Sequence, residues 1–479
     1  MPEGGATAVG RRAAPAFWAP GDDGAVLLRV HDAALLTLER NVVPGRRPGD
    51  PPFLRAGGGY ADPWTRDAGI NSWLAASLLM PDVARATLLA VTEDGPDGPV
   101  VAQDDQWWDQ AVWAVAAHHH ALVTGDDEFL RNASGIAART LRICEQRQLS
   151  DGLFLGPAVM QDGISGYPRA LLDPALEHDS FVLSHPRSHR VACLSTNALH
   201  VLAYDAAAGM AELLGHDPEP ARAKAAALRT RIEETFWDPA AGRYDYVVDP
   251  ATGERFAYDE ALGLALALLA GAVPPERRSG VVAGLHRTAH GVVNVWPHTE
   301  GYDDASPSRH GAMCWPMVMG MWVWAEAAAG CAVDAGTDLL HLARLLDASD
   351  GIYELYDPVT GQPHGGWQAL REWRSEPDQT WSAAGYLGAL LHGVVGMRPG
   401  PDGLRFEPAV PAALSGAWLR DLPYRGSRLD ITLSGEGSVL AEVRVDGRAV
   451  PADAAVHLPA RTGGPVRVDL RCTTTEGSA

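Results

Sequence analysis

Acidic side chains in the loops between apolar segments are the residues whose type and spacing best suit chemistry. Seven loops carry unusual polar and aromatic residues, and they read WTRD (64–67), QWWDQ (106–110), MQDGISGYP (160–168), WPHTEGYDD (296–304), SRHGAMCWP (308–316), YELYDP (353–358) and DQTWS (378–382). Catalytic residues concentrate on loops held by a rigid scaffold. Two carboxylates can hydrolyse a glycosidic bond, because one protonates the leaving oxygen while the other activates water or attacks the sugar. The chain has 60 Asp and Glu residues, so position in a loop is what narrows the choice of the two catalytic carboxylates.

Side chains that could bind a sugar lie in or beside the same loops. Arg66 can orient Asp67 toward sugar hydroxyls, although Asp67 could instead cap the helix that follows it. His310 is either a hydrogen-bond partner of the substrate or a structural residue. We expect the substrate to contact Trp64, Arg66, Asp67, Trp107, Trp108, Asp109, Tyr167, His310, Trp315, Tyr353, Gln379 and Trp381, with only one of Trp107 and Trp108 lining the pocket.

The composition favours a carbohydrate partner and disfavours polyanions. Fifteen Trp residues against eight Phe residues is an unusual ratio. Indole faces stack on the apolar faces of sugar rings, although Trp also fills large cores. The formal charge of −21 argues against nucleic acid and anionic membrane surfaces, which bind basic proteins.

The sequence indicates no metal site, no disulfide framework and no secretory signal. The five cysteines show no CxxC spacing, which fits a reducing cytosol. Consecutive residues His118, His119 and His120 point in different directions on a helix, so they cannot chelate one ion together. The N-terminus has no apolar core of a secretory signal, and the longest apolar run is interrupted by Pro316, Gly320 and Glu326. We therefore expect a cytoplasmic protein without cofactor, monomeric or a small homo-oligomer.

The chain alternates helical segments with Gly, Pro and Asp loops as far as about residue 398. Apolar periodicity predicts helices at 68–92, 107–124, 128–147, 196–214, 219–236, 258–270, 275–288, 311–330, 336–346 and 380–395, with another possible at 25–40. Segment 261–271 is apolar nearly all round, which suits an inner layer, while 218–236 is amphipathic and suits an outer layer. We predict a flexible N-terminus over 1–24, a mainly α catalytic domain over 25–398 and a small antiparallel β module over 399–479, where the alternation is strand-like.

Several of these motifs together resemble those of six-hairpin glycosidases. WTRDAGIN (64–71), GLFLGPAVMQDGISGYP (152–168), SRHGAMCWPMVMG (308–320) and the stretch from IYELYDP to DQTWSAAGYLGALL (352–391) are similar, in this order, to glycoside hydrolase family 63 and to amylo-1,6-glucosidase-like enzymes. The matches span about Gly59 to Gly447, and His310-Gly311 stands where those families carry His-Asn-Gly.

The resemblance implies an (α/α)6 barrel and an inverting glycoside hydrolase of α-glucosidase-like type. Carried over by position, Asp162 becomes the general acid and Glu354 the general base, with Asp173, Glu177 and Asp179 as rivals of Asp162. A general acid at neutral pH implies a raised pKa for Asp162 and an ionised Glu354. Two alternatives share the barrel: an inverting phosphorylase, which needs a cationic phosphate clamp, and a non-catalytic sugar-binding protein.

Overall fold

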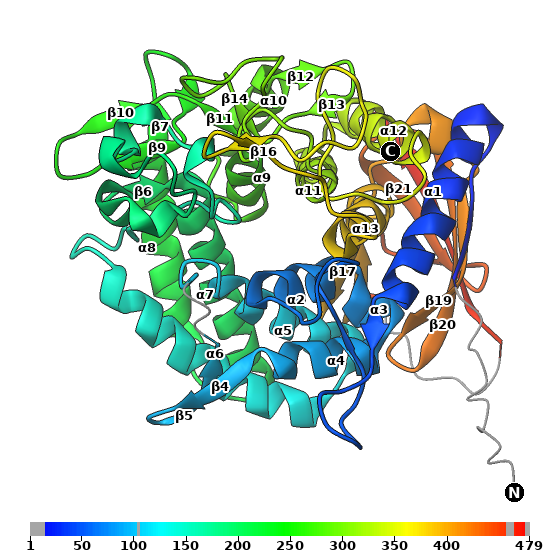
Figure 1. Cartoon of the computed structure of the whole chain (residues 1–479). Helices are drawn as coiled ribbons and strands as arrows, with labels where there is room; N and C mark the ends of the chain where they lie inside the picture. Colours follow the sequence, from blue (N-terminus) through cyan, green and yellow to red (C-terminus); the bar gives the residue numbers. More distant parts are fainter. Residues whose placement is uncertain (1–14, 103–105, 457–463, 475–479) are drawn as a thin grey trace, which may run out of the picture.

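The protein is mainly helical and carries a sheet near its C-terminus (Figure 1). The computed structural model describes residues 15–102, 106–456 and 464–474. Its α-helices are α1 (Gly21–Arg40), α2 (Thr65–Asn71), α3 (Ser77–Leu79), α4 (Pro81–Ala90), α5 (Ala111–Thr124), α6 (Asp127–Cys144), α7 (Leu194–Leu213), α8 (Glu219–Phe236), α9 (Ala261–Leu269), α10 (Pro275–Gly284), α11 (Pro316–Ala328), α12 (Ala332–Asp347) and α13 (Thr380–Gly388). Two π-helical segments, Ser72–Ala76 and Ala389–Val394, continue α2 and α13.

Alternate helices form a closed ring. Helix α2 contacts α5, and the contacts continue through α7, α9 and α11 to α13, which returns to α2 (Figure 1). Every residue of α9 from Ala261 to Leu268 is buried, because a ring helix is covered by two neighbours and by outer elements. Helices α1, α6, α8 and α12 pack outside the ring against α13, α5, α7 and α11.

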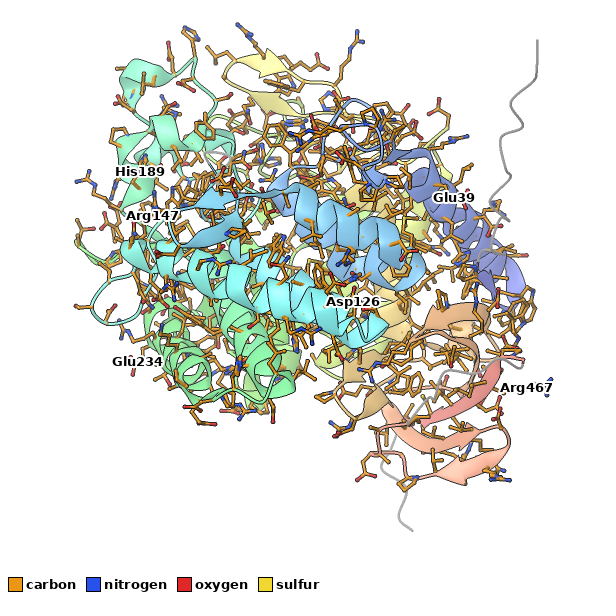
Figure 2. All side chains as sticks on the ribbon, turned by 90° about the horizontal axis from the view of Figure 1, so that it is seen from below. Glu39, Asp126, Arg147, His189, Glu234 and Arg467 are labelled. Atoms are coloured by element: carbon orange, nitrogen blue, oxygen red, sulfur yellow. The ribbon has the colours of Figure 1, made fainter. Side chains whose placement is uncertain are left out.

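The outer helices have one apolar stripe each. In α8 the buried residues are Ala225, Leu228, Ile232 and Phe236, which recur on one helical face. Figure 2 shows outer helix α6 crossing the lower side of the molecule between the labelled Asp126 and Arg147. The Asp126 side chain accepts a hydrogen bond from the Phe129 N–H and so caps the start of α6.

The C-terminal sheet has six strands in the order β1-β19-β20-β23-β21-β22. They are β1 (Ala16–Trp18), β19 (Trp418–Tyr424), β20 (Ser427–Gly435), β21 (Val439–Val445), β22 (Arg448–Val450) and β23 (Val466–Thr473). The predicted antiparallel module is therefore a mixed sheet, because β23 pairs parallel with β20 and antiparallel with β21. The chain passes through β21 and β22 before β23 returns to lie between β20 and β21.

The structure also differs from the prediction of a flexible segment over residues 1–24. Strand β1 pairs with β19, so that Phe17 lies opposite Leu419, and α1 begins at Gly21. Phe17 is buried in the same continuous core as the ring helices and the sheet. Burial of this apolar side chain and the ladder to β19 anchor the segment from residue 15 onward. Residues 1–14 lie outside the described part of the chain.

Short strands occupy the loops and the hairpin that follows the ring. They are β2 (Val42–Val43) with β3 (Phe53–Leu54), β4 (Thr92–Gly95) with β5 (Gly98–Val101), β6 (Ala192–Cys193) with β9 (Val247–Asp249) and β10 (Glu254–Phe256), β7 (Trp237–Asp238) with β8 (Arg243–Tyr244), β11 (Asp259–Glu260) with β14 (Val295–Trp296), β12 (Arg287–Thr288) with β13 (Gly291–Val292), β15 (Trp367–Gln368) with β16 (Arg371–Glu372), and β17 (Met397–Gly400) with β18 (Gly403–Phe406). Among the described residues, no helix is long and apolar enough to cross a membrane.

Two buried carboxyl groups share one arginine where α11 packs on α12. Arg287 donates from Nε to Asp338 at 2.9 Å and from a terminal nitrogen to Glu326 at 2.7 Å. Burial first, and then the neighbouring Asp338, raises the pKa of Glu326 well above its usual value. Glu326 therefore holds a proton in the folded protein well above the pH at which it is lost from the unfolded chain.

We expect Glu326→Gln to gain stability over the wild type as the pH rises. A carboxyl pKa that is higher in the folded state contributes stability that is lost as the pH rises from the unfolded pKa through the folded pKa. Glutamine has no proton to lose. Each unit by which the pKa of Glu326 differs between the folded and unfolded states is worth about 1.4 kcal/mol of stability. Thermal melts at about pH 5 and about pH 8 measure the effect. A Tm difference that is the same at both values would contradict the prediction, and Glu372→Gln, an exposed carboxyl, is the control.

Candidate active site

A cavity of about 300 Å³ lies where the loops that precede α2, α11 and α13 come together. Its wall combines carboxylates, cations, amides and aromatic rings. The lining residues are Tyr60, Trp64, Arg66, Asp67, Gln106, Asp162, Ser180, Phe181, Arg309, His310, Trp315, Glu354, Gln368, Trp373, Gln379 and Trp381. Both predicted catalytic carboxylates, Asp162 and Glu354, are therefore in one pocket, together with Trp64, Arg66, Asp67, His310, Trp315, Gln379 and Trp381 from the predicted substrate contacts.

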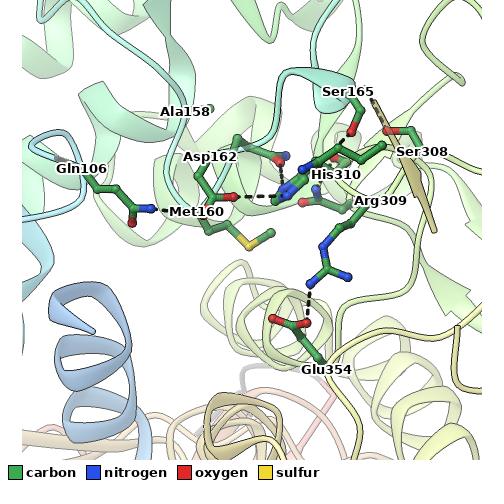
Figure 3. Close-up of polar contacts among 12 residues, drawn as sticks. Gln106, Ala158, Met160, Asp162, Ser165, Ser308, Arg309, His310 and Glu354 are labelled. Atoms are coloured by element: carbon green, nitrogen blue, oxygen red, sulfur yellow. Dashed lines mark hydrogen bonds and ion pairs between the residues drawn. The ribbon is translucent and has the colours of Figure 1, made fainter. Parts of the chain in front are cut away.

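Asp162 lies among cationic and amide side chains. Its Oδ1 is 3.2 Å from Nε2 of His310, and its Oδ2 accepts from Gln106 at 3.2 Å (Figure 3). Oδ2 also lies 3.5 Å from a terminal nitrogen of Arg66. Burial alone would raise the pKa of Asp162, but Arg66, His310 and Arg309 outweigh it and hold the pKa below its usual value. The expected raised pKa is thus not found in this state of the pocket, because three basic groups surround the carboxylate.

Glu354 is paired with Arg309. Its Oε2 is 2.5 Å from one terminal nitrogen of Arg309 (Figure 3). The other terminal nitrogen of Arg309 donates to the Gly365 carbonyl. Burial raises the pKa of Glu354 above its usual value, although Arg309 opposes the shift. The two carboxylates are thus held by successive residues of one loop, since Arg309 contacts Glu354 and His310 contacts Asp162.

The aromatic wall of the pocket is fixed by ring contacts. Trp315 and Trp381 meet edge to face at 5.6 Å, and Trp315 donates its indole N–H to the Arg309 carbonyl. Arg66 lies 5.3 Å from the Trp381 ring centroid, while Trp64 at the rim is 46% exposed. Indole faces beside carboxylates suit a sugar ring, whose hydroxyls need acceptors and whose C–H faces need apolar contact.

Asp67 lines the pocket from the first turn of α2 and is buried. Burial raises its pKa to about 7, and the negative charges of Glu354 and Asp162 add to the shift that Arg66 opposes. Asp67 is not the N-cap residue of this helix, because α2 begins at Thr65 and its N-cap is Trp64.

Four of the predicted aromatic contacts do not line the pocket. Trp107 and Trp108 are both buried in a core cluster, with Arg147 over the Trp107 ring at 4.0 Å. Tyr167 is buried, where its hydroxyl accepts from the Ala158 N–H and donates to the Gln161 carbonyl. Tyr353 points toward Asp350 and donates to it. These side chains pack around the loops that form the pocket.

Asp109 also lies behind the pocket wall. It is 1% exposed and forms an ion pair of 2.8 Å with Arg66. Burial raises its pKa to about 6 against the opposing charge of Arg66. It cannot reach a ligand directly, so its predicted substrate contact is not supported by its position.

Several residues that line the pocket were not predicted from the sequence. They are Tyr60, Gln106, Ser180, Phe181, Arg309, Gln368 and Trp373. Gln106 and Arg309 lie within the motifs QWWDQ and SRHG, so their place in these motifs could have identified them as pocket residues. Gln368 and Trp373 belong to the region of the β15–β16 hairpin, and no local pattern marks a hairpin that folds back over a pocket.

Within the described residues, no group of three or more His, Cys, Asp or Glu side chains is placed to hold a metal ion. The three consecutive histidines are neutral at neutral pH, because burial lowers the pKa values of His118 and His120 to about 4 and that of His119 further. His119 packs against His392 and His120 against Phe129, which gives them separate packing roles.

A helical fold with paired carboxylates in an aromatic pocket is that of the helical glycoside hydrolases. The chain belongs to the family described as mannosylglycerate hydrolase MGH1-like glycoside hydrolase domain, whose family model matches residues 63–382. No curated protein matches the chain.

Solved structures show the same fold. A glycoside hydrolase family 63 mannosylglycerate hydrolase from Thermus thermophilus is 20% identical with a TM-score of 0.55, and the match covers 75% of this chain and 99% of that one. A chain named sialidase matches with a TM-score of 0.68 and 15% identity over 91% of this chain and 40% of its own length. A rhamnosidase from Klebsiella oxytoca is 15% identical with a TM-score of 0.53, over 80% of this chain and 66% of that one. At these identities the likeness shows the fold alone.

Proposed function

We propose that the protein is an inverting glycoside hydrolase that cleaves a small α-glycoside in an (α/α)6 barrel. The catalytic domain would span about residues 25–398 and the β module 399–479, with strand β1 added to it. The observation that carries this proposal is the arrangement of one loop, in which neighbouring residues Arg309 and His310 each contact one of two pocket carboxylates. Two carboxylates held apart in this way suit acid–base hydrolysis.

In the proposed mechanism Asp162 is the general acid. Burial lowers the pKa of His310 to about 4, so the ring is neutral near pH 7, and we place its proton on Nδ1, which lies 3.2 Å from the acceptor Oε1 of Gln161. Nε2 is then an acceptor for a protonated Asp162. The Asp162 side chain is 29% exposed, and a sugar that covers it adds to the burial that already favours the protonated form.

Glu354 would act as the general base and activate water on the opposite face of the sugar. An ionised Glu354 is favoured by its ion pair with Arg309. Inversion leaves room for that water, so we expect the two carboxyl groups to stand about 6.5–9.5 Å apart with substrate bound. Asp67, Trp64 and Trp381 are proposed to bind the sugar, Asp67 as an acceptor for hydroxyls and the indoles by stacking.

The size of the cavity favours one sugar with a small aglycone. A volume of about 300 Å³ is at the lower end of the range of ligand sites. The family name points to mannosylglycerate as the first compound to test, and one of the Thermus thermophilus structures holds Tris and D-glycerate. A cytoplasmic location and a monomeric or small oligomeric state stay predictions.

The test is a panel of small α- and β-glycosides that includes mannosylglycerate, with the product followed by proton NMR. We expect hydrolysis of an α-glycoside and initial release of the β-anomer, since inversion changes the configuration at the anomeric carbon. Initial release of the α-anomer would show retention, and turnover that requires inorganic phosphate would show a phosphorylase. Binding of sugars with no turnover of any glycoside would identify a non-catalytic sugar-binding protein.

A further inference from the structure

The chain just before Asp162 is in a strained conformation. Met160 has a φ of 59°, in the left-handed region that non-glycine residues rarely adopt, and its side chain is fully buried. Such a conformation persists only where the surroundings determine it. Met160 precedes Asp162 by two residues. The contacts that hold Met160 therefore also set the direction in which the Asp162 side chain points from the backbone.

Three successive backbone N–H groups in this segment are each held by a side chain from elsewhere. The Ala158 N–H donates to the Tyr167 hydroxyl at 2.8 Å and the Val159 N–H to Oγ of Ser195 at 3.0 Å. The N–H of the strained Met160 donates to Oδ1 of Asp109 at 3.1 Å. The segment is therefore clamped, and its strained residue is held by Asp109.

Asp109 reaches Asp162 by a second route. Its Oδ2 accepts from a terminal nitrogen of Arg66 at 2.8 Å, and the other terminal nitrogen of Arg66 lies 3.5 Å from Oδ2 of Asp162. The buried Asp109 carboxylate thus holds both the backbone that precedes Asp162 and the Arg66 cation beside the Asp162 side chain. Among the described residues, Tyr167 and Ser195 hold the backbone of this segment but form no hydrogen bond or ion pair with Arg66 or Asp162.

We propose that Asp109 is a positioning residue for Asp162, which fixes both its backbone direction and the place of its Arg66 partner. The inference rests on the proposed role of Asp162 as general acid. It assigns to Asp109 no contact with substrate, which agrees with its burial behind Arg66. Both oxygens must act as acceptors at once, and this requirement can be tested by a single isosteric change.

In Asp109→Asn the side chain keeps its shape but has one acceptor. If the amide oxygen faces Arg66, the amide nitrogen meets the Met160 N–H, and the reverse orientation sets it against Arg66. We expect kcat on a glycoside with a poor leaving group to fall about 10- to 100-fold, with KM little changed, because small misplacements of a catalytic group cost rates of this order. On the corresponding glycosyl fluoride, which needs little proton donation, the loss should shrink to within about 3-fold of wild type.

Two further variants separate positioning from general damage. Asp245→Asn is the matched control, since Asp245 is also 1% exposed and ion-paired with an arginine, Arg255, but lies outside the pocket. Tyr167→Phe removes a clamp on the same segment without touching Arg66, and it should cost less than Asp109→Asn. Equal losses on the poor substrate and the fluoride, or wild-type activity in Asp109→Asn, would overturn the proposal.

A crystal structure of Asp109→Asn tests the geometry independently of activity. We expect Met160 to leave its left-handed conformation, or Arg66 to separate from Asp162. An unchanged Met160, Arg66 and Asp162 in this variant would overturn the inference, whatever its activity. A wild-type protein that hydrolyses no glycoside would contradict the proposed function. In that case the conformation of Met160 and the position of Arg66 in the Asp109→Asn structure still decide whether Asp109 positions Asp162.

Discussion

Asp162→Asn is expected to lower kcat on a glycoside with a poor leaving group by about 10²- to 10⁴-fold, the usual range for loss of a general acid. Asparagine keeps the acceptor for Arg66 and Gln106 but cannot deliver a proton to the leaving oxygen. Folding and substrate binding should be little changed, because the side chain is partly exposed in the pocket wall. Steady-state kinetics with matched Tm values measure the effect.

A glycosyl fluoride distinguishes the role of Asp162 from a general defect. Fluoride leaves with little proton donation, so the variant should recover most of the wild-type rate on this substrate. This experiment is needed because basic neighbours hold the pKa of Asp162 low while burial raises that of Glu354. If Glu354→Gln recovers on the fluoride and Asp162→Asn does not, the two roles are reversed.

The second large effect is expected for Glu354→Gln, which should lose about 10²- to 10⁴-fold in kcat on both substrates. Water must be activated whatever the leaving group, and glutamine cannot accept its proton. The exposed Glu372, near the pocket on the β15–β16 hairpin, gives the control Glu372→Gln with near-wild-type rates. Similar turnover in Glu354→Gln and wild type would make this residue a structural carboxylate.

The raised pKa of Glu354 also predicts the acid limb of the pH profile. A base must be ionised, so kcat/KM should fall as the pH decreases through a value above the ordinary pKa of glutamate. Arg309 opposes the shift, and therefore Arg309→Met should move this limb to still higher pH. A limb that stays in place when Arg309 is removed would show that another group controls it.

The sequence by itself determined the helical class, most helix positions and several of the loops that line the pocket. Helical periodicity depends on residues three and four apart, so α8 was predicted with its observed bounds, 219–236. The motifs placed Asp162, Glu354, His310 and Trp315 in loops that precede buried helices, and the structure brings all four to one pocket. Their catalytic and binding roles stay predictions.

Only the tertiary structure decided which of two similar acidic residues faces the cavity. Asp67 and Asp109 both stand in loop motifs that contain Trp, yet Asp67 lines the pocket and Asp109 lies behind Arg66. Trp107 and Trp108 both proved to be core residues, because burial depends on segments far away in the chain. Likewise, β1 pairs with β19 between Ala16 and Arg420, and β23 inserts parallel to β20. A local pattern shows that a segment can be a strand or a loop, but the partner across the sheet or pocket is set by long-range packing, which no window of sequence contains.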